Sequence, residues 1–443
     1  MSDFESLMWT LDGDARLSST VGNLTLLDRV PDRDRLRARI AAAAVAVPRL
    51  RQRVQPNPLG LGTPIWVDDD AFELDRHLRW EHLGPNAGQR RLLDRAMELM
   101  TAPFDRHRPL WEFVVFSGLT RGRAAMLQRI HHTLTDGEGG LRISMEFIDF
   151  ERDAPWSAPI SSPSGNPPWS AQDGLRRWVR DTAVAVADAG GSLVRPMATL
   201  RPGALVEMAR STARQANFTE HARSPLWTQR SLDRHLDLLS IPLADLRSVA
   251  DRLGGTVNDV FVTVGAHASA DLHHRAGIEV EHLRMAMPVS TRRSGNIGNH
   301  FSPSQSLVPT GPMSFADRFA EIHTVLSATK GETAIDATEL LAGAANLIPP
   351  PLLRAAGTRL ASTVDFITSN LKASPVDVYL GGAHMTGNHP IGPLANTAWN
   401  MTAMSYIGQM CIGIVSDTAA VVDPDELTDA LRRAFGAAKR SHP

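Results

Sequence analysis

The sequence predicts an α/β protein made of two domains. Three observations support this: the chain has 443 residues, helical and strand-like patterns alternate along it, and a segment rich in Pro, Ser and Gly interrupts them. A chain of this length is too long for one ordinary hydrophobic core. We therefore expect a first domain over residues 1–153, a partly helical linker interrupted by Pro and Gly over 154–225, and a second domain over 226–443.

The first domain is predicted from its alternating helical and strand patterns. Pro31 and Asp32 open a helix whose apolar residues share one face, and Pro48 ends it. The elements expected after it are a helix over about 89–101, strands at 111–117 and 123–130, and a helix at 141–147.

The linker is predicted from its composition, which turns rich in Pro, Ser and Gly between Ala154 and Ser170. Helical stretches follow to about Gln215, and residues 174–214 hold seven arginines against three acidic residues. This basic amphipathic segment either lies on an anionic membrane or packs between the domains with its charges solvated.

The second domain begins near Leu226. Ile241 and Pro242 start a helix that ends at Gly254-Gly255, and Thr256 is a good N-cap for the next one. The further elements expected are that next helix over 257 to about 272, strands at 284–290, 377–380 and 410–415, and a closing helix over 423–440.

The composition excludes several classes of protein. The formal net charge is −2 and the pI about 6.8, so nothing favours nucleic acid as a partner. The single cysteine, Cys411, excludes an intramolecular disulfide, and its apolar neighbours indicate a buried structural thiol. The N-terminus lacks a signal peptide, and the longest run of small apolar residues, 40–47, is far too short to span a membrane. We expect a cytoplasmic protein whose membrane contact is peripheral.

The strongest chemical signal is the run from His131 to Gly137, which reads HHTLTDG. Two adjacent histidines are followed by Asp136 and Gly137, and together they supply a base, a turn and a charge that can fix the loop. Because side chains alternate along the preceding strand, His131 and His132 should point to opposite sides. Only one of them then faces a given cleft.

Two other interpretations compete for these histidines. A zinc pair prefers histidines at i and i+4 on a helix, and no cluster of Cys or His supplies the missing ligands. A lone histidine is more often a satisfied core residue than a functional one. The spacing of both histidines with Asp-Gly favours a functional site over a core residue.

The run resembles the HHxxxDG signature of CoA-dependent acyltransferases, a superfamily that includes chloramphenicol acyltransferases and peptide-synthetase condensation domains. Further segments narrow the resemblance to the bacterial wax ester synthase/diacylglycerol acyltransferase (WS/DGAT) family. These segments occur in the expected order along nearly the whole chain. They are 48–51, the stretch from Pro64 to His77, 109–112, Asn258-Asp259, 288–292, Gly298-Asn299, Ser369-Asn370 and 405–408. HHxxxDG alone is shared by several reaction types, but this ordered set is specific.

The resemblance implies two similarly built, chloramphenicol-acetyltransferase-like α/β domains with a channel between them. It implies an O-acyltransferase that moves a long-chain acyl group from acyl-CoA, a substrate and not a cofactor, to diacylglycerol, a long-chain fatty alcohol or both. No metal or redox cofactor is implied, and we expect the protein at the inner membrane face or on lipid inclusions. Two alternatives stay open: another HHxxxDG acyltransferase with a carrier-protein-bound acyl donor, and a non-catalytic lipid-binding protein on the same scaffold.

The resemblance also implies roles for the residues of the run. His132 is the general base that takes the hydroxyl proton, a task suited to the usual histidine pKa of about 6.5. His131 orients the loop or accepts a hydrogen bond. Asp136 is an orienter of the base or, as the resemblance favours, a structural ion-pair partner of Arg292 across the domain boundary. Gly137 helps to close the turn.

Three further residues are candidate binding or supporting groups. Asn258 and Asn299 have side chains that can polarise or position a substrate, while the alternatives are a helix cap at Asn258 and a plain turn at Asn299. Trp111, at the start of a predicted strand, either lines the acyl or alcohol channel or belongs to the core.

The C-terminal part departs from the family pattern. Where the family commonly has Ser-Asn-Val-Pro-Gly-Pro, this chain has Ser369-Asn370 followed by Leu-Lys-Ala-Ser-Pro. Ser369 and Asn370 are still candidate binding or supporting residues, and Lys372 either contacts a CoA phosphate or is an isolated surface lysine. These departures bear on the choice of acceptor more than on catalysis.

Overall fold

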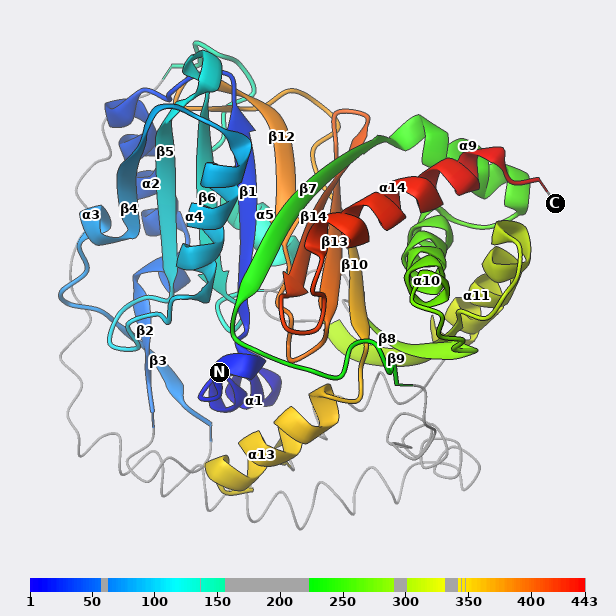
Figure 1. The fold of residues 1–443 in the computed structure, drawn as a ribbon. Coiled ribbons are helices and arrows are strands. Elements are labelled where there is room, and N and C mark those ends of the chain that lie inside the picture. Colours follow the sequence, from blue (N-terminus) through cyan, green and yellow to red (C-terminus); the bar gives the residue numbers. More distant parts are fainter. Residues whose placement is uncertain are drawn as a thin grey trace, which may run out of the picture.

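The computed structural model describes residues 1–56, 63–135, 137–155, 223–290, 301–330, 342–343, 345–346 and 348–442. Figure 1 shows two sheets side by side, with the N-terminal half on one side and most of the C-terminal half on the other. The elements of residues 1–155 are α1 (Asp3–Leu11), η1 (Ala15–Leu17), β1 (Thr20–Leu27), α2 (Arg33–Ala46), η2 (Pro48–Arg51), β2 (Gln52–Gln55), β3 (Ile65–Asp68), α3 (Leu74–His77), β4 (Leu78–Ala87), α4 (Gln89–Thr101), β5 (Trp111–Leu119), η3 (Thr120–Gly122), β6 (Ala124–His131) and α5 (Gly137–Met145).

The described part of the C-terminal half contributes a second set of helices and strands. They are β7 (Arg234–Pro242), α9 (Leu243–Leu253), α10 (Val257–Arg275), β8 (His282–Ser290), β9 (Phe301–Pro309), α11 (Phe315–Lys330), α13 (Pro350–Ala361), β10 (Phe366–Lys372), β11 (Tyr379–Leu380), β12 (Ala383–Ile391), β13 (Trp399–Tyr406), β14 (Gln409–Asp417) and α14 (Pro424–Arg440).

The N-terminal sheet has the strand order β11-β12-β1-β6-β5-β4 and is buried on both faces. Met126 and Ile130 of β6 pack into a core with residues of α2 and α5. Ala125 and Leu127, which alternate with them, pack into a second core with α4. All eight residues of β6 are buried, so the end of this strand delivers its side chains into the interior.

The two halves of the chain share this sheet. β11 and β12 come from residues 379–391, yet β12 pairs with β1 in antiparallel register, with Thr25 opposite Asn388. A C-terminal domain confined to 226–443 therefore does not describe this segment. Strand pairing decides the exchange, because backbone groups at the β1 edge need partners and β12 supplies them. The expected linker lies almost wholly outside the described residues.

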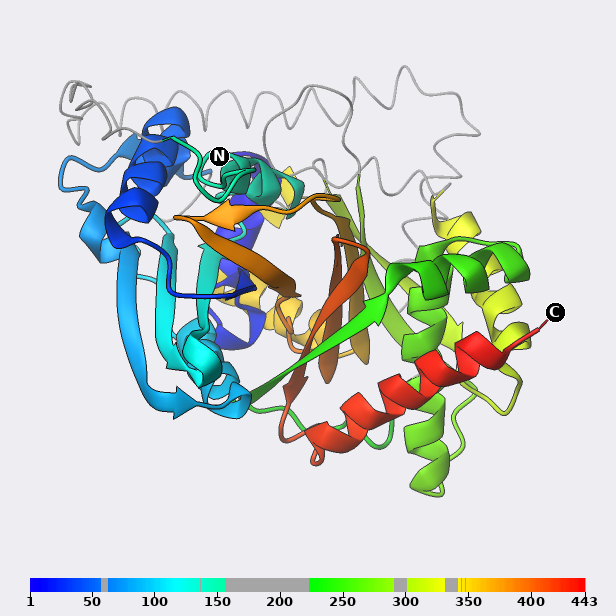
Figure 2. The same cartoon turned by 90° about the horizontal axis from the view of Figure 1, so that it is seen from above.

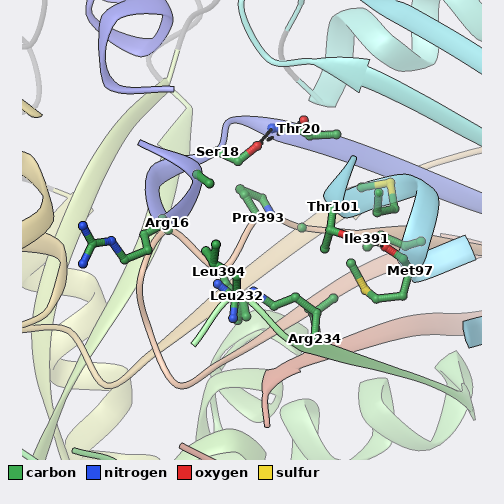
Figure 3. Close-up of a pocket in the computed structure, with 15 residues that line it drawn as sticks. Arg16, Ser18, Thr20, Met97, Thr101, Leu232, Arg234, Ile391, Pro393 and Leu394 are labelled. Carbon is green, nitrogen blue, oxygen red and sulfur yellow. Dashed lines mark hydrogen bonds between the residues drawn. The ribbon is translucent and has the colours of Figure 1, made fainter. Parts of the chain in front are cut away.

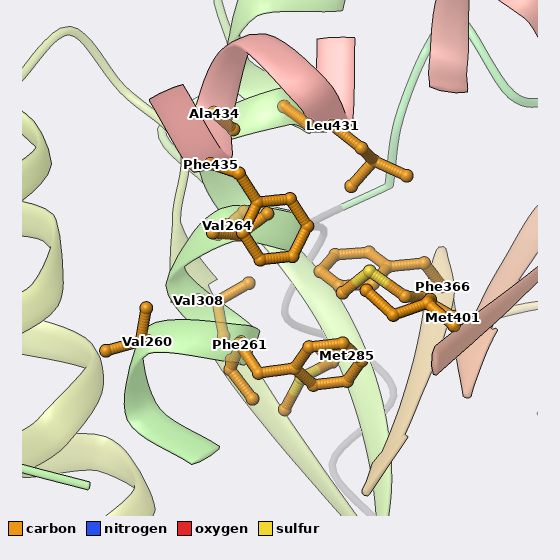
Figure 4. Packing of buried hydrophobic residues seen from close by; sticks show 14 of the residues in the cluster. Val260, Phe261, Val264, Met285, Val308, Phe366, Met401, Leu431, Ala434 and Phe435 are labelled. Atoms are coloured by element: carbon orange, nitrogen blue, oxygen red, sulfur yellow. The ribbon is translucent and has the colours of Figure 1, made fainter. Parts of the chain in front are cut away.

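The C-terminal sheet has the order β7-β14-β13-β10-β8-β9 and packs against helices α9, α10, α11 and α14. Its core is apolar, and Figure 4 shows Phe261 and Val264 of α10 facing Met285, Phe366 and other sheet residues. Phe366 stacks on Trp399 at a centroid distance of 4.6 Å. This core joins the helices expected at 241–254, 257–272 and 423–440 and the strands expected at 284–290 and 410–415 into one unit.

The other face of the C-terminal sheet meets the N-terminal sheet, and Figure 2 shows β12 beside the strands of the C-terminal sheet at this junction. A Cβ added to Gly413 of β14 would lie 2.0 Å from the carbonyl oxygen of Pro390 in β12. Only glycine permits so close a backbone approach. Tyr406 Oη donates to the Met385 carbonyl at 3.0 Å, which adds a polar tie across the same junction.

Several expected helices are confirmed at their ends. Asp32 caps α2, α4 spans 89–101 as expected, and Thr256 and Asp423 cap α10 and α14. Other bounds are corrected: the helix expected at 141–147 runs from Gly137 to Met145, and the strand expected at 377–380 is only Tyr379–Leu380. The helix expected from Ile241 begins at Leu243, because β7 pairs with β14 through Pro242.

Candidate active site

The two histidines lie at the end of β6, where the strand passes into a turn. The His131 N–H donates to the Leu110 carbonyl at 2.9 Å, and the His132 N–H donates to the Ser19 carbonyl at 2.8 Å. The Leu134 N–H donates to the His131 carbonyl at 2.9 Å and closes the turn. Neighbouring strands on both sides therefore fix the backbone of the pair.

His131 is a buried residue with a fixed environment. Its side chain is 2% exposed, and the rings of Trp9 and Phe104 approach it edge-on, with centroids 6.3 and 6.4 Å away. Its Nδ1 accepts the Thr133 N–H at 3.2 Å and lies 2.8 Å from Thr133 Oγ1. Because Nδ1 accepts, the proton of the neutral ring belongs on Nε2, which lies 3.3 Å from Asp12 Oδ1.

Asp12 is a site residue that the sequence did not reveal. It follows α1 and accepts hydrogen bonds from the Ser19 N–H at 3.1 Å and from Arg106 Nη2 at 2.8 Å. Burial alone would raise the pKa of its carboxyl, but His131, Arg106 and the Ser19 N–H together lower it to about 2. The carboxylate is therefore charged at neutral pH. Nothing near Asp12 in the sequence marks it, because its side-chain partners Arg106 and His131 lie about a hundred residues away.

His132 is partly exposed, in contrast to its neighbour. His132 directly follows β6, and from the alternation along this strand we still expect its side chain on the face of Gln128 and Ile130, opposite to His131. A base must reach its substrate, so the partly exposed histidine is the better candidate for the chemistry.

The segment that follows the histidines, α5 and the residues up to Asp149, is held at its C-terminal end by ion pairs. Asp149, 3% exposed, pairs with Arg35 at 2.6 Å and with Arg39 at 2.5 Å, and so ties the end of the α5 region to α2. Gly137 is the first residue of α5. Asp136 and its expected partner Arg292 lie outside the described residues, so their ion pair stays a prediction.

A polar network that the sequence did not predict lies on the same sheet face as Gln128. Thr25 Oγ1 donates to Asn388 Oδ1 at 3.0 Å and accepts from Gln128 Nε2 at 3.4 Å, and Asn23 also bonds Asn388. Ser144 of α5 reaches Gln128 Oε1 at 3.3 Å. The network joins β1, β6, β12 and α5, so no local sequence signal could have revealed it.

Trp111 belongs to the core. It is 1% exposed, its Nε1 donates to the Leu50 carbonyl at 2.8 Å, and His77 stacks on it with centroids 4.7 Å apart. His77 Nδ1 also bonds the Trp111 carbonyl at 2.7 Å. Of the two roles expected for Trp111, this geometry supports the structural one, and it links the family segments around residues 50, 77 and 111.

The remaining candidates lie in the C-terminal half. Asn258 is the second residue of α10; its Nδ2 contacts Met287 Sδ at 3.6 Å, while Asp259 completes the cap with Thr256. Ser369 and Asn370 are partly buried in the middle of β10, opposite Thr402 and Ala403 of β13, and their role in binding stays a prediction. Lys372 is exposed at the end of β10, and Asn299 lies outside the described residues.

Two cavities lie near the histidine turn. One, of about 100 Å³, is lined by residues of both halves of the chain: Thr20, Met97 and Thr101 come from the N-terminal half, and Arg234, Ile391 and Leu394 from the C-terminal half (Figure 3). The other, of about 210 Å³, is lined by Trp9, Asp12, Phe104, Arg106 and His131 among others. Each is smaller than the roughly 300–1,000 Å³ of ordinary ligand pockets, so neither alone holds a long acyl chain.

One group of possible metal ligands occurs among the described residues: His235, Asp237 and Asp425, whose ligand atoms lie within 4.8 Å of one another. Arg90 Nη1 lies 3.0 Å from His235 Nε2 and 3.1 Å from Asp237 Oδ1. The guanidinium of Arg90 offsets the charge of Asp237 and would repel a cation. The ion pairs of this group join α4 and β7.

Comparison with known proteins identifies the family. Residues 1–261 match the model described as wax ester synthase/diacylglycerol acyltransferase catalytic domain, and residues 297–439 match the WS/DGAT C-terminal domain. A Mycobacterium tuberculosis H37Rv protein named a putative diacylglycerol O-acyltransferase is 31% identical over 97% of this chain and 89% of its own length.

Solved structures share the fold. The wax ester synthase/diacylglycerol acyltransferase from Marinobacter aquaeolei VT8 superposes with a TM-score of 0.67 at 20% identity, covering 98% of this chain and 97% of its own. The first condensation domain of the calcium-dependent antibiotic synthetase gives a TM-score of 0.61 at 15% identity, covering 99% and 96%. The expected fold of two α/β halves is confirmed. The chain is an acyltransferase and belongs to the wax ester synthase/diacylglycerol acyltransferase family.

Proposed function

We propose that this acyltransferase moves a long-chain acyl group from acyl-CoA to diacylglycerol, to a long-chain fatty alcohol or to both. The products are then triacylglycerol or wax ester. The observation that carries the proposal is the histidine pair, whose backbone is fixed by Leu110 and Ser19 and whose second member is partly exposed. The names of the family and of its mycobacterial relative support the choice of acceptors.

In the proposed reaction His132 acts as the general base. It takes the proton of the acceptor hydroxyl while the hydroxyl oxygen attacks the thioester carbonyl. The tetrahedral intermediate then expels CoA as a thiolate, and the proton held by His132 passes to that sulfur. One C–O bond forms, one C–S bond breaks, and free CoA thiol leaves. An ordinary thiol pKa of about 8.5 makes the thiolate a good leaving group, so no covalent acyl-enzyme is required.

Peripheral contact with a lipid surface is part of the same proposal, since the acceptors are apolar. Within the described residues, no helix is long and apolar enough to cross a membrane. Around α13, Leu352 is 64% exposed, Ile348 41% and Leu360 39%, and Arg359 is exposed beside them. An apolar face with an arginine fits the boundary between acyl chains and anionic headgroups.

The lipid contact can be tested by sedimentation with anionic phospholipid vesicles. Leu352→Glu should bind the vesicles less than wild type, while Val422→Glu, a matched change at a side chain 86% exposed elsewhere, should not. Equal vesicle binding by wild type and Leu352→Glu would contradict a role for α13. The basic segment 174–214, expected as an alternative contact, lies outside the described residues.

The reaction is tested by release of free thiol from palmitoyl-CoA, with hexadecanol and dipalmitoylglycerol offered separately. We expect release that depends on the alcohol and falls by roughly 10²–10⁴ in a folded His132→Ala variant. The faster acceptor then names the preferred product. Release by the variant at the wild-type rate would refute the role of His132. No release with either acceptor would favour a carrier-protein-bound donor or a lipid-binding protein.

A further inference from the structure

The carboxylate of Asp12 lies beside the ring of His131, the first histidine of the active-site turn. It is 17% exposed, and its Oδ1 lies 3.3 Å from Nε2 of His131, an ion-pair contact rather than an aligned hydrogen bond. The same oxygen accepts the Ser19 N–H at 3.1 Å. Arg106 holds the second carboxylate oxygen at 2.8 Å, so the group cannot rotate freely. Asp12 therefore has a fixed orientation toward His131.

Ser19 connects Asp12 indirectly to the second histidine through two hydrogen bonds. The Ser19 carbonyl accepts the His132 N–H at 2.8 Å, directly beyond the last residue pair of β1 and β6, Thr20 and His131. Ser19 is thus bonded to Asp12 through its N–H and to His132 through its carbonyl. Asp12 is therefore linked directly to the ring of His131 and, through Ser19, to the backbone of His132.

The surroundings favour a defined state of His131. Thr133 occupies Nδ1 of the ring, and Trp9 and Phe104 restrict its plane. The carboxylate faces the remaining ring nitrogen, whose N–H is the complementary donor. Arg106, which also lies over the Trp9 ring at 4.1 Å, balances the negative charge. The arrangement selects the Nε2–H tautomer.

We propose that Asp12 is a positioning residue for the acyl transfer. It holds His131 in one tautomer and, through Ser19, sets the place of the proposed base His132. The proposal rests on the proposed function for its effect on rate, but the tautomer of His131 can be observed without any reaction. Misplacement of a base by about 1 Å can cost about 10²-fold in rate, so loss of Asp12 should lower turnover strongly.

The rate test compares Asp12→Asn with Asp14→Asn in the full chain. Asp14, two residues on, caps η1 and bonds Arg16 and Thr358, without a contact to either histidine, so it is a matched control. We expect Asp12→Asn to stay folded, to lower kcat about 10–100-fold and to leave KM for palmitoyl-CoA nearly unchanged. Asp14→Asn should keep kcat within about two-fold, and Asp12→Glu should recover part of the loss.

The second readout is the ¹⁵N spectrum of the imidazole rings, with His131→Gln used to assign the signal. Wild type and Asp14→Asn should show His131 as the Nε2–H tautomer, and Asp12→Asn should show a mixture. An unchanged tautomer in Asp12→Asn, or kcat within two-fold of wild type, would overturn the proposal. If wild type itself releases no thiol, the proposed function fails, and the tautomer spectrum still decides the role of Asp12.

Discussion

Both halves of the molecule bury charged side chains beside an apolar core, but the histidine turn lies in the N-terminal half. The core of the C-terminal half consists of Phe, Val, Met, Leu and Trp residues between its sheet and its helices. At the histidine end of the N-terminal half, Arg129 is 3% exposed and His131 2% exposed; in the C-terminal half, Asp259 and Arg318 are each 2% exposed. Under the proposed mechanism the C-terminal half is a scaffold, and the N-terminal half positions the proposed base.

The largest expected loss of stability comes from the C-terminal core. Phe261 is fully buried in α10, and Phe261→Ala should lower the free energy of unfolding by about 3–5 kcal/mol, because it leaves a cavity. Denaturant unfolding measures the change, and Val422→Ala, at a side chain 86% exposed, should change little. If this half is a scaffold, the remaining folded protein keeps its kcat. A lower kcat of the folded Phe261→Ala protein would contradict a purely structural role of the C-terminal half.

The junction between the halves should make stability depend on pH. Burial lowers the pKa of His389, which is 4% exposed and bonds Ser240, to about 4. The unfolded chain takes up this proton near pH 6.5 and the folded chain only near pH 4, so stability falls as the pH drops between these values. Protonation of His389 in the unfolded chain should lower the free energy of unfolding by about 3 kcal/mol over this pH range.

The matching variant is His389→Gln, which should show a smaller loss of unfolding free energy between pH 7 and pH 4.5 than wild type. His107→Gln, a change at an exposed histidine, should keep the wild-type pH dependence. An identical pH dependence in His389→Gln and wild type would show that the junction does not bury a neutral imidazole.

A methyl group added at the junction should also be costly. Gly413→Ala places a Cβ against the Pro390 carbonyl and should destabilise the protein by about 1–3 kcal/mol, because the backbones of β12 and β14 must separate. Gly436→Ala, inside α14, should be neutral or stabilising, since alanine is the better helix former. Thermal unfolding of both variants measures the change in stability. A Gly413→Ala protein as stable as wild type would contradict the close approach of the β12 and β14 backbones.

The smallest expected effect is the loss of a helix cap in the scaffold. Thr256→Ala removes the acceptor for the Asp259 N–H and should cost about 1 kcal/mol. Thr324→Ala, at an exposed position inside α11, should not be destabilising. An equal loss in both variants, measured by denaturant unfolding, would mean that the cap contributes nothing specific.

The sequence predicted best what depends on neighbours along the chain. Apolar periodicity and capping residues such as Asp32 and Thr256 predicted the helices, whereas the opposite orientation expected for the two histidines stays a prediction. Contacts between distant segments could not be predicted. β12 joins the N-terminal sheet, and Asp12 meets His131, only because the fold brings together strands and turns that no local pattern relates.

The most direct test of the account is alcohol-dependent thiol release by folded His132→Gln beside folded His131→Gln. If His132 is the base and His131 positions it, the His132 variant should lose at least about 10²-fold in kcat, and the His131 variant should lose less. Near-wild-type turnover by His132→Gln, or a greater loss in His131→Gln, would contradict the division of roles that the structure supports.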